Sequence, residues 1–401
     1  MQDSRETTAE FDATGTTVPA AGSAATPDPG AAALAGTPAS AGTPASAGTP
    51  ADGGAVWSHS DTSASADSDT PVSSGGDALG QRSDSAGELG TPLSATGDVV
   101  SAADDDSAFA AFDTPIARAA RAAVRVQAGS LEALPRPAQT RVLTVANQKG
   151  GVGKTTTTVN TAAALALQGL DVLVIDLDPQ GNASTALGLP HQAGTSSVYE
   201  VLIDGLPLAD VVRPVPDLPR LTGVPATIDL AGAEIELVSL VARETRLARA
   251  IAAYLPVHEA RHGRPLDFVL VDCPPSLGLL TLNAMVAARE VFIPIQCEYY
   301  ALEGLGQLLG TVDLVKAHLN PALHVSSILL TMYDARTRLA AQVAQEVRDH
   351  FGDLVLRTAV PRSVRLSEAP SYAQTVLTYD PGSSGALSYL EVARELTGSG
   401  S

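Results

Sequence analysis

The chain has 401 residues, with 44 acidic residues against 25 Lys and Arg, and a formal net charge of −19 at pH 7. Positions 1–115 hold 17 of the acidic and two of the basic residues, which leaves 27 acidic and 23 basic for the rest, so the acidity says little about that remainder. Two cysteines exclude a disulfide framework and a paired Cys-x-x-Cys metal site, and no apolar run reaches the roughly 18 residues of a membrane span.

The first segment, residues 1–115, is rich in Ala, Gly, Thr, Ser, Pro and Asp, and a hexamer that begins at Ala35 repeats at Ala41 and, imperfectly, at Ala47. Large apolar side chains are sparse in it. Such a segment buries too little apolar surface to offset an entropy cost of roughly 1–2 kcal/mol per ordered residue. We therefore expect a disordered, acidic, low-complexity tail without a signal peptide. It would serve as a solvating tail or come from an over-extended gene start.

Residues 116–140 are rich in Ala and Arg, and Arg118, Arg121 and Arg125 recur at helical spacing. The pattern predicts a linker or a short helix that the prolines from Pro135 onward break. A solvated helix face is the simpler interpretation of these arginines, and contact with nucleic acid is the alternative.

From position 141 onward, apolar strand candidates alternate with helical stretches. The strand candidates are Val142–Ala146, Asp171–Asp176, Phe268–Val271, Val291–Ile295, Val325–Thr331 and Leu354–Ala359. The helical candidates are Thr155–Gln168, 229–254 and Leu339–His350. This alternation predicts an α/β fold with a mostly parallel, doubly wound sheet and helices on both faces. Ligands of such folds bind at the carboxyl ends of the strands.

The segment Lys149–Thr156 has the form of a phosphate-binding loop, because it follows a strand and opens a helix. Its residues between the two lysines are Gly150, Gly151, Val152 and Gly153. Glycines let backbone N–H groups close around phosphate oxygens, and the helix N-terminus favours negative charge. We expect Lys154 to reach the terminal phosphates and the Thr155 hydroxyl to ligate Mg²⁺, with Thr156 beside them.

Two features of this loop bear on that interpretation. The chain has only three lysines, and two of them lie in this loop, which indicates a chemical demand for them. The general pattern, however, expects Gly where this chain has Gln148. The alternative interpretation is a glycine-rich turn that binds no ligand.

Three carboxylates lie at or just after the ends of strand candidates. Asp176 is the last residue of the second candidate, and Asp178 follows two positions later. We expect Asp178 to orient the attacking water and Asp176 to lie near Mg²⁺ or its waters. Strand-end aspartates also form turns or cap helices, which is the alternative. Asp272 ends a run of four apolar residues, as in the Walker B motif, and would bind Mg²⁺ directly or through water. Cys273 is expected to be a buried thiol without a catalytic role.

The loop sequence Lys-Gly-Gly-x-Gly-Lys-Thr-Thr resembles the deviant Walker A motif of the ParA/Soj partitioning ATPases and their MinD relatives. Two further segments, Thr227–Leu237 and Pro361–Ser371, also resemble that family. The resemblance covers roughly residues 141–397, within an expected ATPase domain of residues 141–401. It implies Mg²⁺-dependent hydrolysis of ATP and, in the family, a catalytic lysine at the position of Lys149 that crosses a dimer to the partner's ATP. The residue matching Asp178 is the hydrolysis residue.

The resemblance also implies further contacts and partners. It places Met332 and Pro361 near the adenine, and it matches Arg336 and Arg365 to positions that contact non-specific DNA. An ATP-dependent homodimer, double-stranded DNA and a ParB/Spo0J-like stimulating protein are the implied partners. The resemblance further implies that the protein is cytoplasmic, associates with the nucleoid and has no membrane partner.

Three other functions are alternatives for this sequence. A MinD-like membrane-cycling ATPase that regulates the division site would need a terminal amphipathic helix, and Tyr389–Ser401 shows no broad basic extension. A reductase resembling the nitrogenase iron protein would need cysteines in contexts that Cys273 and Cys297 lack. A non-hydrolysing adaptor is disfavoured because Lys154, Thr155 and the acidic residues are all present.

Overall fold

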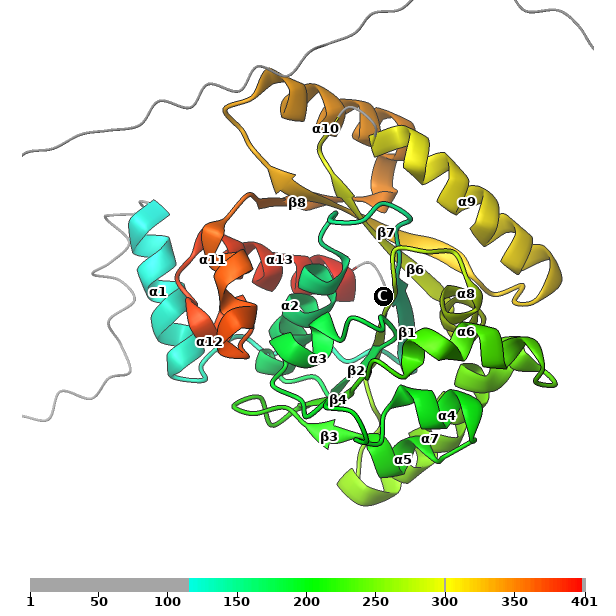
Figure 1. Ribbon diagram of the computed structural model, residues 1–401. Coiled ribbons are helices and arrows are strands. Elements are labelled where there is room, and N and C mark those ends of the chain that lie inside the picture. Colours follow the sequence, from blue (N-terminus) through cyan, green and yellow to red (C-terminus); the bar gives the residue numbers. More distant parts are fainter. Residues whose placement is uncertain (1–114, 299–300, 399–401) are drawn as a thin grey trace, which may run out of the picture. The chain divides into compact units, whose positions relative to one another are not determined.

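The computed structural model describes residues 115–298 and 301–398 (Figure 1). The expected acidic tail therefore lies outside the described residues, apart from its last position. Among the described helices, none is both long and apolar enough to cross a bilayer.

The described chain forms one eight-stranded sheet in the order β3-β4-β2-β5-β1-β6-β7-β8. All neighbouring strands are parallel except β3 and β4, which pair in antiparallel. The strands are β1 (Arg141–Val145), β2 (Val172–Asp176), β3 (Arg213–Pro214), β4 (Leu221–Val224), β5 (Phe268–Asp272), β6 (Glu290–Gln296), β7 (His324–Tyr333) and β8 (Val355–Pro361). The α/β, mostly parallel sheet is thus confirmed, and every strand candidate of the sequence matches a strand to within one residue at the candidate's ends or extends into a longer one.

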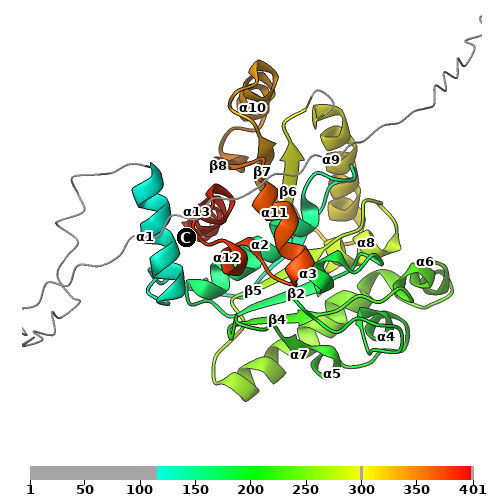
Figure 2. The same cartoon turned by 60° about the vertical axis from the view of Figure 1, so that its left-hand side comes forward.

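Helices cover both faces of the sheet (Figures 1 and 2). The helices α2, α12 and α13 pack on one face, and the helices from α4 to α10 pack on the other. The α-helices are α1 (Pro115–Gln127), α2 (Lys154–Leu167), α3 (Asn182–Ala186), α4 (Val198–Ile203), α5 (Leu208–Val211), α6 (Leu230–Val238), α7 (Arg246–His262), α8 (Leu279–Ala287), α9 (Ala301–His318), α10 (Arg338–Phe351), α11 (Val364–Glu368), α12 (Val376–Tyr379) and α13 (Ser384–Gly398).

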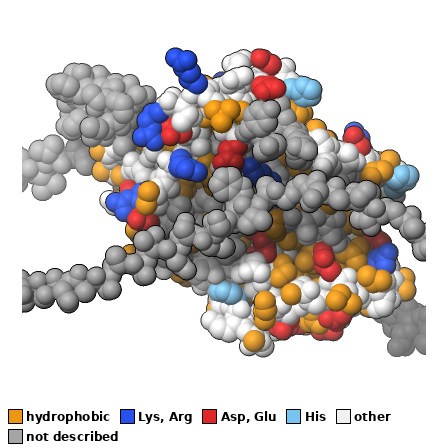
Figure 3. Space-filling view, turned by 45° about the horizontal axis from the view of Figure 1, so that its top comes forward, with side chains coloured by type: hydrophobic (Ala, Val, Ile, Leu, Met, Phe, Trp, Pro, Cys, Tyr) orange, Lys and Arg blue, Asp and Glu red, His pale blue; other side chains and the backbone are white. Residues whose placement is uncertain are grey.

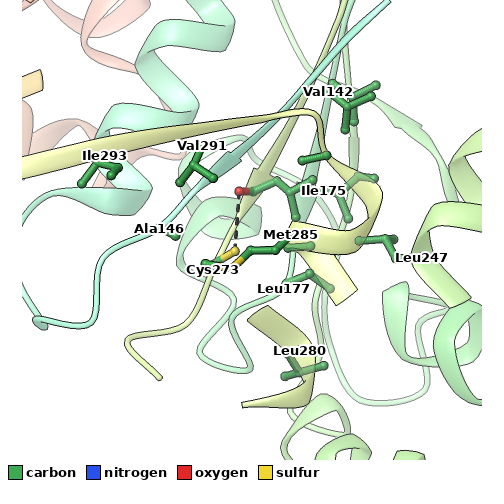
Figure 4. Packing of buried hydrophobic residues seen from close by; sticks show 14 of the residues in the cluster. Val142, Ala146, Ile175, Leu177, Leu247, Cys273, Leu280, Met285, Val291 and Ile293 are labelled. Carbon is green, nitrogen blue, oxygen red and sulfur yellow. Dashed lines mark hydrogen bonds between the residues drawn. The ribbon is translucent and has the colours of Figure 1, made fainter. Parts of the chain in front are cut away.

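Strand residues alternate between two apolar cores, as the two-residue period of a strand requires. In β1, Leu143 and Val145 belong to the core under α2 and α13, whereas Val142 belongs to the core on the opposite face. Figure 4 shows the second core, where Cys273 and Met285 pack among aliphatic side chains. Both faces of the central strands are therefore buried, which explains their continuous apolar runs.

Two helix predictions are wrong in detail. The predicted helix 229–254 is interrupted after Val238, and α7 starts only at Arg246. Between them, the Ser239 hydroxyl donates to the carbonyl oxygen of Glu236 (2.9 Å), and Ala242 adopts a left-handed φ of 54°, which ends the helical path. The predicted helix at 116–140 exists as α1, but it ends before Gly129 (φ 62°), well before the prolines.

A cluster of two buried carboxylates and three partly exposed arginines stabilises the edge of the sheet at which β2 and β5 begin. The carboxylate of Asp171 contacts Arg136 (3.2 Å), Arg220 (3.1 Å) and Arg264 (2.5 Å). Asp267 accepts from Arg136 and from the backbone N–H of Asp171 (2.7 Å). Burial alone would raise the pKa of Asp171, but hydrogen bonds from Arg264 and Arg136 outweigh it and hold that pKa below its ordinary value. The cluster ties the segment that follows α1 to the sheet.

We expect Asp171→Asn to lower the free energy of unfolding by about 2 kcal/mol at neutral pH, a value reduced because solvent reaches the partly exposed arginines. Because the folded-state pKa of Asp171 is lowered, its contribution is present above the ordinary aspartate pKa and is lost as pH falls through the folded value. Urea unfolding at pH 7 and at about pH 3 measures this difference. A deficit that stays constant across this range, or equals that of the exposed control Asp313→Asn, would contradict it.

Candidate active site

The loop between β1 and α2 has the backbone that its glycines predict. Gly151 (φ 74°) and Gly153 (φ 88°) adopt left-handed conformations that side chains disfavour. Gly153 directly precedes Lys154, the first residue of α2, and carries no side-chain cap. The first N–H groups of α2 and its positive dipole end are therefore available to an anion.

A cavity of about 480 Å³ lies at this helix end. The loop residues that line it are Gly150, Gly151, Gly153, Lys154, Thr155 and Thr156. Asp178 and Met332 line it as well. A second cavity of about 380 Å³ shares Gly153, Thr156 and Met332 with the first and adds Pro361. The two cavities therefore adjoin each other beside the loop. Lys149, Val152, Asp176 and Asp272 line neither cavity.

Lys154 is buried, and its Nζ donates to the carbonyl oxygen of Lys149 (3.1 Å). Burial lowers the pKa of Lys154, whereas the charges of Asp272 and Asp178 act in the opposite direction. The ammonium group of Lys154 therefore lies beside acidic side chains at the cavity, where the phosphates of a nucleotide would bind.

Asp272 ends β5 with a fully buried carboxylate. Its Oδ2 accepts from the hydroxyl of Thr155 (2.8 Å), and its Oδ1 accepts from the hydroxyl of Thr158 (2.9 Å). Burial and the neighbouring carboxylate of Asp176 raise the pKa of Asp272. A divalent cation beside Thr155 would supply the missing positive charge, and hydroxyl and carboxylate oxygens are ligands that Mg²⁺ prefers. These residues therefore fit Mg²⁺.

Asp176 lies beside Asp272 on the neighbouring strand, and both of its carboxylate oxygens accept hydrogen bonds from the protein. Its Oδ1 accepts from the N–H of Asp178 (3.1 Å), and its Oδ2 accepts from the N–H (2.8 Å) and hydroxyl (2.7 Å) of Ser184. Both oxygens are thus used to fix the start of α3 and the backbone of Asp178. Asp178 itself faces the cavity and accepts from the N–H of Gln180 (3.0 Å).

Lys149 does not line the cavity, and its side chain pairs with Glu298. Their Nζ and Oε2 atoms lie 2.9 Å apart, with side chains 39% and 48% exposed, and Glu298 also accepts from Gln296 (2.5 Å). An exposed pair of this kind contributes little free energy, so Lys149 can leave it for a stronger anion.

Sequence reasoning missed the supporting residues Thr158, Ser184 and Glu298. Only Thr158 carries a local signal, since it lies one helical turn after Thr155 on the same face of α2. The other two reach the site through the fold.

Arg336 and Arg365 are exposed and already hold acidic partners. Arg336 pairs with Asp334 (2.9 Å), and Arg365 pairs with Glu368 (2.9 Å) and Asp380 (3.2 Å). A ligand with more negative charge would have to compete with these carboxylates.

We expect Thr158→Val to weaken the magnesium dependence of nucleotide binding by roughly tenfold, because Asp272 loses one of its two orienting hydroxyls. Titration of Mg²⁺ with a fluorescent ATP analogue measures this change. The matched control is Thr157→Val, since the buried Thr157 hydroxyl faces Tyr389 (3.4 Å) and not the carboxylate. Equal magnesium midpoints for the two variants would show that Thr158 does not position Asp272.

Comparisons with known proteins agree with this geometry. The family described as AAA domain matches residues 140–325. The sporulation initiation inhibitor protein Soj of Bacillus subtilis (strain 168) is 50% identical over 260 residues, which cover 65% of this chain and 99% of Soj. The chromosome partitioning protein ParA of Caulobacter vibrioides (strain NA1000 / CB15N) is 50% identical over 256 residues, which cover 64% of this chain and 93% of ParA.

A solved structure from Mycobacterium smegmatis, described as cobyrinic acid a,c-diamide synthase with bound ADP and magnesium, is 40% identical to this chain. The TM-score is 0.53, and the match covers 64% of this chain and 93% of the Mycobacterium smegmatis chain. That name differs from the names of the two relatives above, which are more similar in sequence.

Proposed function

The chain belongs to the ParA/Soj family of chromosome-partitioning ATPases, and on that premise we propose how its active site drives a cycle of DNA binding and release. The substrate is ATP, and Mg²⁺ is the cofactor. The relatives that are half identical to this chain are Soj and ParA proteins, so the MinD-like alternative is not supported. The observation that carries the proposal is one cavity onto which the loop amides, Lys154, Thr155 and Asp178 converge.

Each residue has a distinct task in hydrolysis. The loop N–H groups and Lys154 bind the β- and γ-phosphates, and Thr155 with Asp272 holds Mg²⁺. When bound, the metal neutralises charge on the phosphate oxygens. Asp178 orients the attacking water by accepting its hydrogen bond, and Asp176 fixes the backbone that carries Asp178.

Lys149 makes the site cooperative between two copies. Within residues 115–298 and 301–398, Glu298 is the acidic partner of its partly exposed ammonium group. We propose that Lys149 exchanges this carboxylate for the ATP phosphates of a second copy, which have a higher negative charge. ATP thereby closes a homodimer, and hydrolysis opens it. Met332 and Pro361 contact the adenine from the adjoining cavity.

The dimer binds double-stranded DNA without sequence preference through Arg336 and Arg365, which exchange their carboxylate partners for phosphates. Two copies double the number of arginines on one duplex, which explains why binding would require ATP. A ParB/Spo0J-like protein stimulates hydrolysis and so releases the DNA, and the ATP-bound protein associates with the nucleoid.

We expect Asp178→Ala to lower ATP turnover on the order of 100-fold, because the attacking water loses its acceptor. Affinity for MgATP should stay within about threefold, since Asp178 does not bind the phosphates. Phosphate release and binding of a fluorescent ATP analogue measure the two effects. Turnover close to that of the surface control Asp313→Ala would remove Asp178 from the reaction.

We expect Arg365→Glu to reduce ATP-dependent DNA retention at least tenfold and to flatten its salt dependence, since each lost phosphate contact lowers the log–log slope by about 0.9. Filter binding at several salt concentrations measures both quantities. Arg261→Glu is the matched control, because Arg261 lies in the last turn of α7, which leads to the opposite edge of the sheet. Unchanged retention by a variant that still dimerises would refute the DNA contact.

A further inference from the structure

Helix α1 packs against α13 (Figures 1 and 2). A cavity of about 300 Å³ lies between the two helices, and it combines arginines with leucines. The residues that line this α1–α13 cavity are Arg121, Arg125, Leu131, Leu387, Leu390, Glu391 and Arg394. None of them lines the two cavities beside the phosphate loop. The α1–α13 cavity is therefore separate from the candidate active site.

The charge of the α1–α13 cavity is unbalanced. Among the described residues that line it, three carry a guanidinium group and only Glu391 carries a carboxylate. Arg394 pairs with Glu391 on the same helix. Within residues 115–298 and 301–398, no carboxylate forms an ion pair with Arg125. An excess of positive charge in a hollow favours an anionic ligand.

The leucines restrict what that ligand can be. Leu131 and Leu387 are partly buried and pack against the core under α2 and α13, and Leu390 is buried. They provide an apolar surface next to the arginines. A peptide with both acidic and apolar side chains matches such a lining, whereas the phosphate backbone of DNA matches only the arginines.

Positive charge alone does not single out this cavity. Exposed arginines also lie on other elements, such as Arg336 after β7 and Arg357 on β8. Figure 3 shows one face of the molecule, on which several Lys and Arg side chains gather at the upper left. What distinguishes the α1–α13 cavity is its apolar lining and its position in the chain, because the segment that precedes α1 is attached directly to it.

That segment has the complementary composition. Asp104–Asp106 is a run of three consecutive aspartates, and Asp113 is a fourth. Phe109 and Phe112, two of the six phenylalanines of the chain, lie between them. The segment contains no Lys or Arg. Residues 104–113 therefore combine four negative charges with two large apolar side chains.

The segment is also long enough to reach the cavity. Helix α1 has 13 residues and is therefore about 20 Å long. Residues 107–114, when fully extended, span roughly 26–29 Å. The three consecutive aspartates can thus fold back along the whole of α1 and reach Arg125 near its end. Because the segment is tethered to α1, its effective concentration at the cavity is on the order of millimolar.

We propose that the segment Asp104–Asp113 docks in the α1–α13 cavity of its own chain. Its carboxylates bind the arginines through charge-assisted hydrogen bonds, and Phe109 and Phe112 cover the leucines. Docking thereby fastens α1 to α13. Duplex DNA is the other polyanion that these arginines could bind, and the experiment below separates the two.

The test uses the full-length protein with Trp57→Phe and Phe109→Trp, so that position 109 carries the only tryptophan. Quenching of its fluorescence by acrylamide is measured without nucleotide. We expect quenching at low salt to be at least about twofold weaker than in the urea-unfolded protein, because leucine side chains cover a docked indole. About 1 M NaCl should largely remove this protection, since it shortens the Debye length to about 3 Å.

In the same background, Arg125→Glu should weaken docking about tenfold, because repulsion replaces a charge-assisted contact. Arg125 is exposed, so the variant should fold as the parent does. Combining it with Asp105→Arg should restore protection, which a general loss of structure could not do. Arg261→Glu is the matched control, since it makes the same change of charge on α7, on the other face of the sheet. It should be quenched as the parent is.

Two results would overturn the inference directly. One is quenching of the parent equal to that of the unfolded protein, and the other is protection that Arg125→Glu leaves unchanged. Protection that appears only when duplex DNA is added, and that Arg125→Glu removes, would assign the cavity to DNA and would overturn the inference as well.

Discussion

Asp272 ends β5 with a fully buried carboxylate, whose oxygens accept hydrogen bonds from the hydroxyls of Thr155 and Thr158. These bonds join the strand to the first turn of α2 and so fix the loop that precedes the helix. The same carboxylate lies beside Asp176, and burial makes this concentration of negative charge unfavourable unless cations are near. Lys154 is one such cation, and Mg²⁺ supplies the other. The active site is therefore incomplete, in electrostatic terms, without its metal and nucleotide.

The charged groups at the two ends of the parallel strands have different roles. At one edge, the buried carboxylate of Asp171 pairs with three arginines and holds the segment after α1 in place. At the other edge, the charged groups are paired loosely. Lys149 on Glu298 and Arg365 on Glu368 are exposed pairs that a phosphate can replace. Rigid support and exchangeable contacts thus lie at opposite ends of the same strands.

Much of the fold and of the candidate active site could be predicted from the sequence. Continuous apolar runs predicted the parallel strands, and the glycines, Lys154 and Thr155 predicted the loop, because local pattern determines both. The break at Ala242 was missed because the helical apolar pattern continues across it. The short strand β4 was missed because four residues, one of them glycine, give little signal. The pairing of Lys149 with Glu298 and of Asp176 with Ser184 depends on tertiary structure, so spacing along the chain could not predict either.

In this mechanism, a triphosphate and Mg²⁺ bind at the loop and draw Lys149 across to a second copy, and every later step follows from that binding. A crystal structure of the Asp178→Ala protein with MgATP tests it most directly. The account predicts magnesium beside Thr155 and Asp272, phosphates on the loop amides and Lys154, and the ammonium group of Lys149 on the ATP of the other copy. An empty loop, or bound ATP with Lys149 still on Glu298 of its own chain, would contradict it.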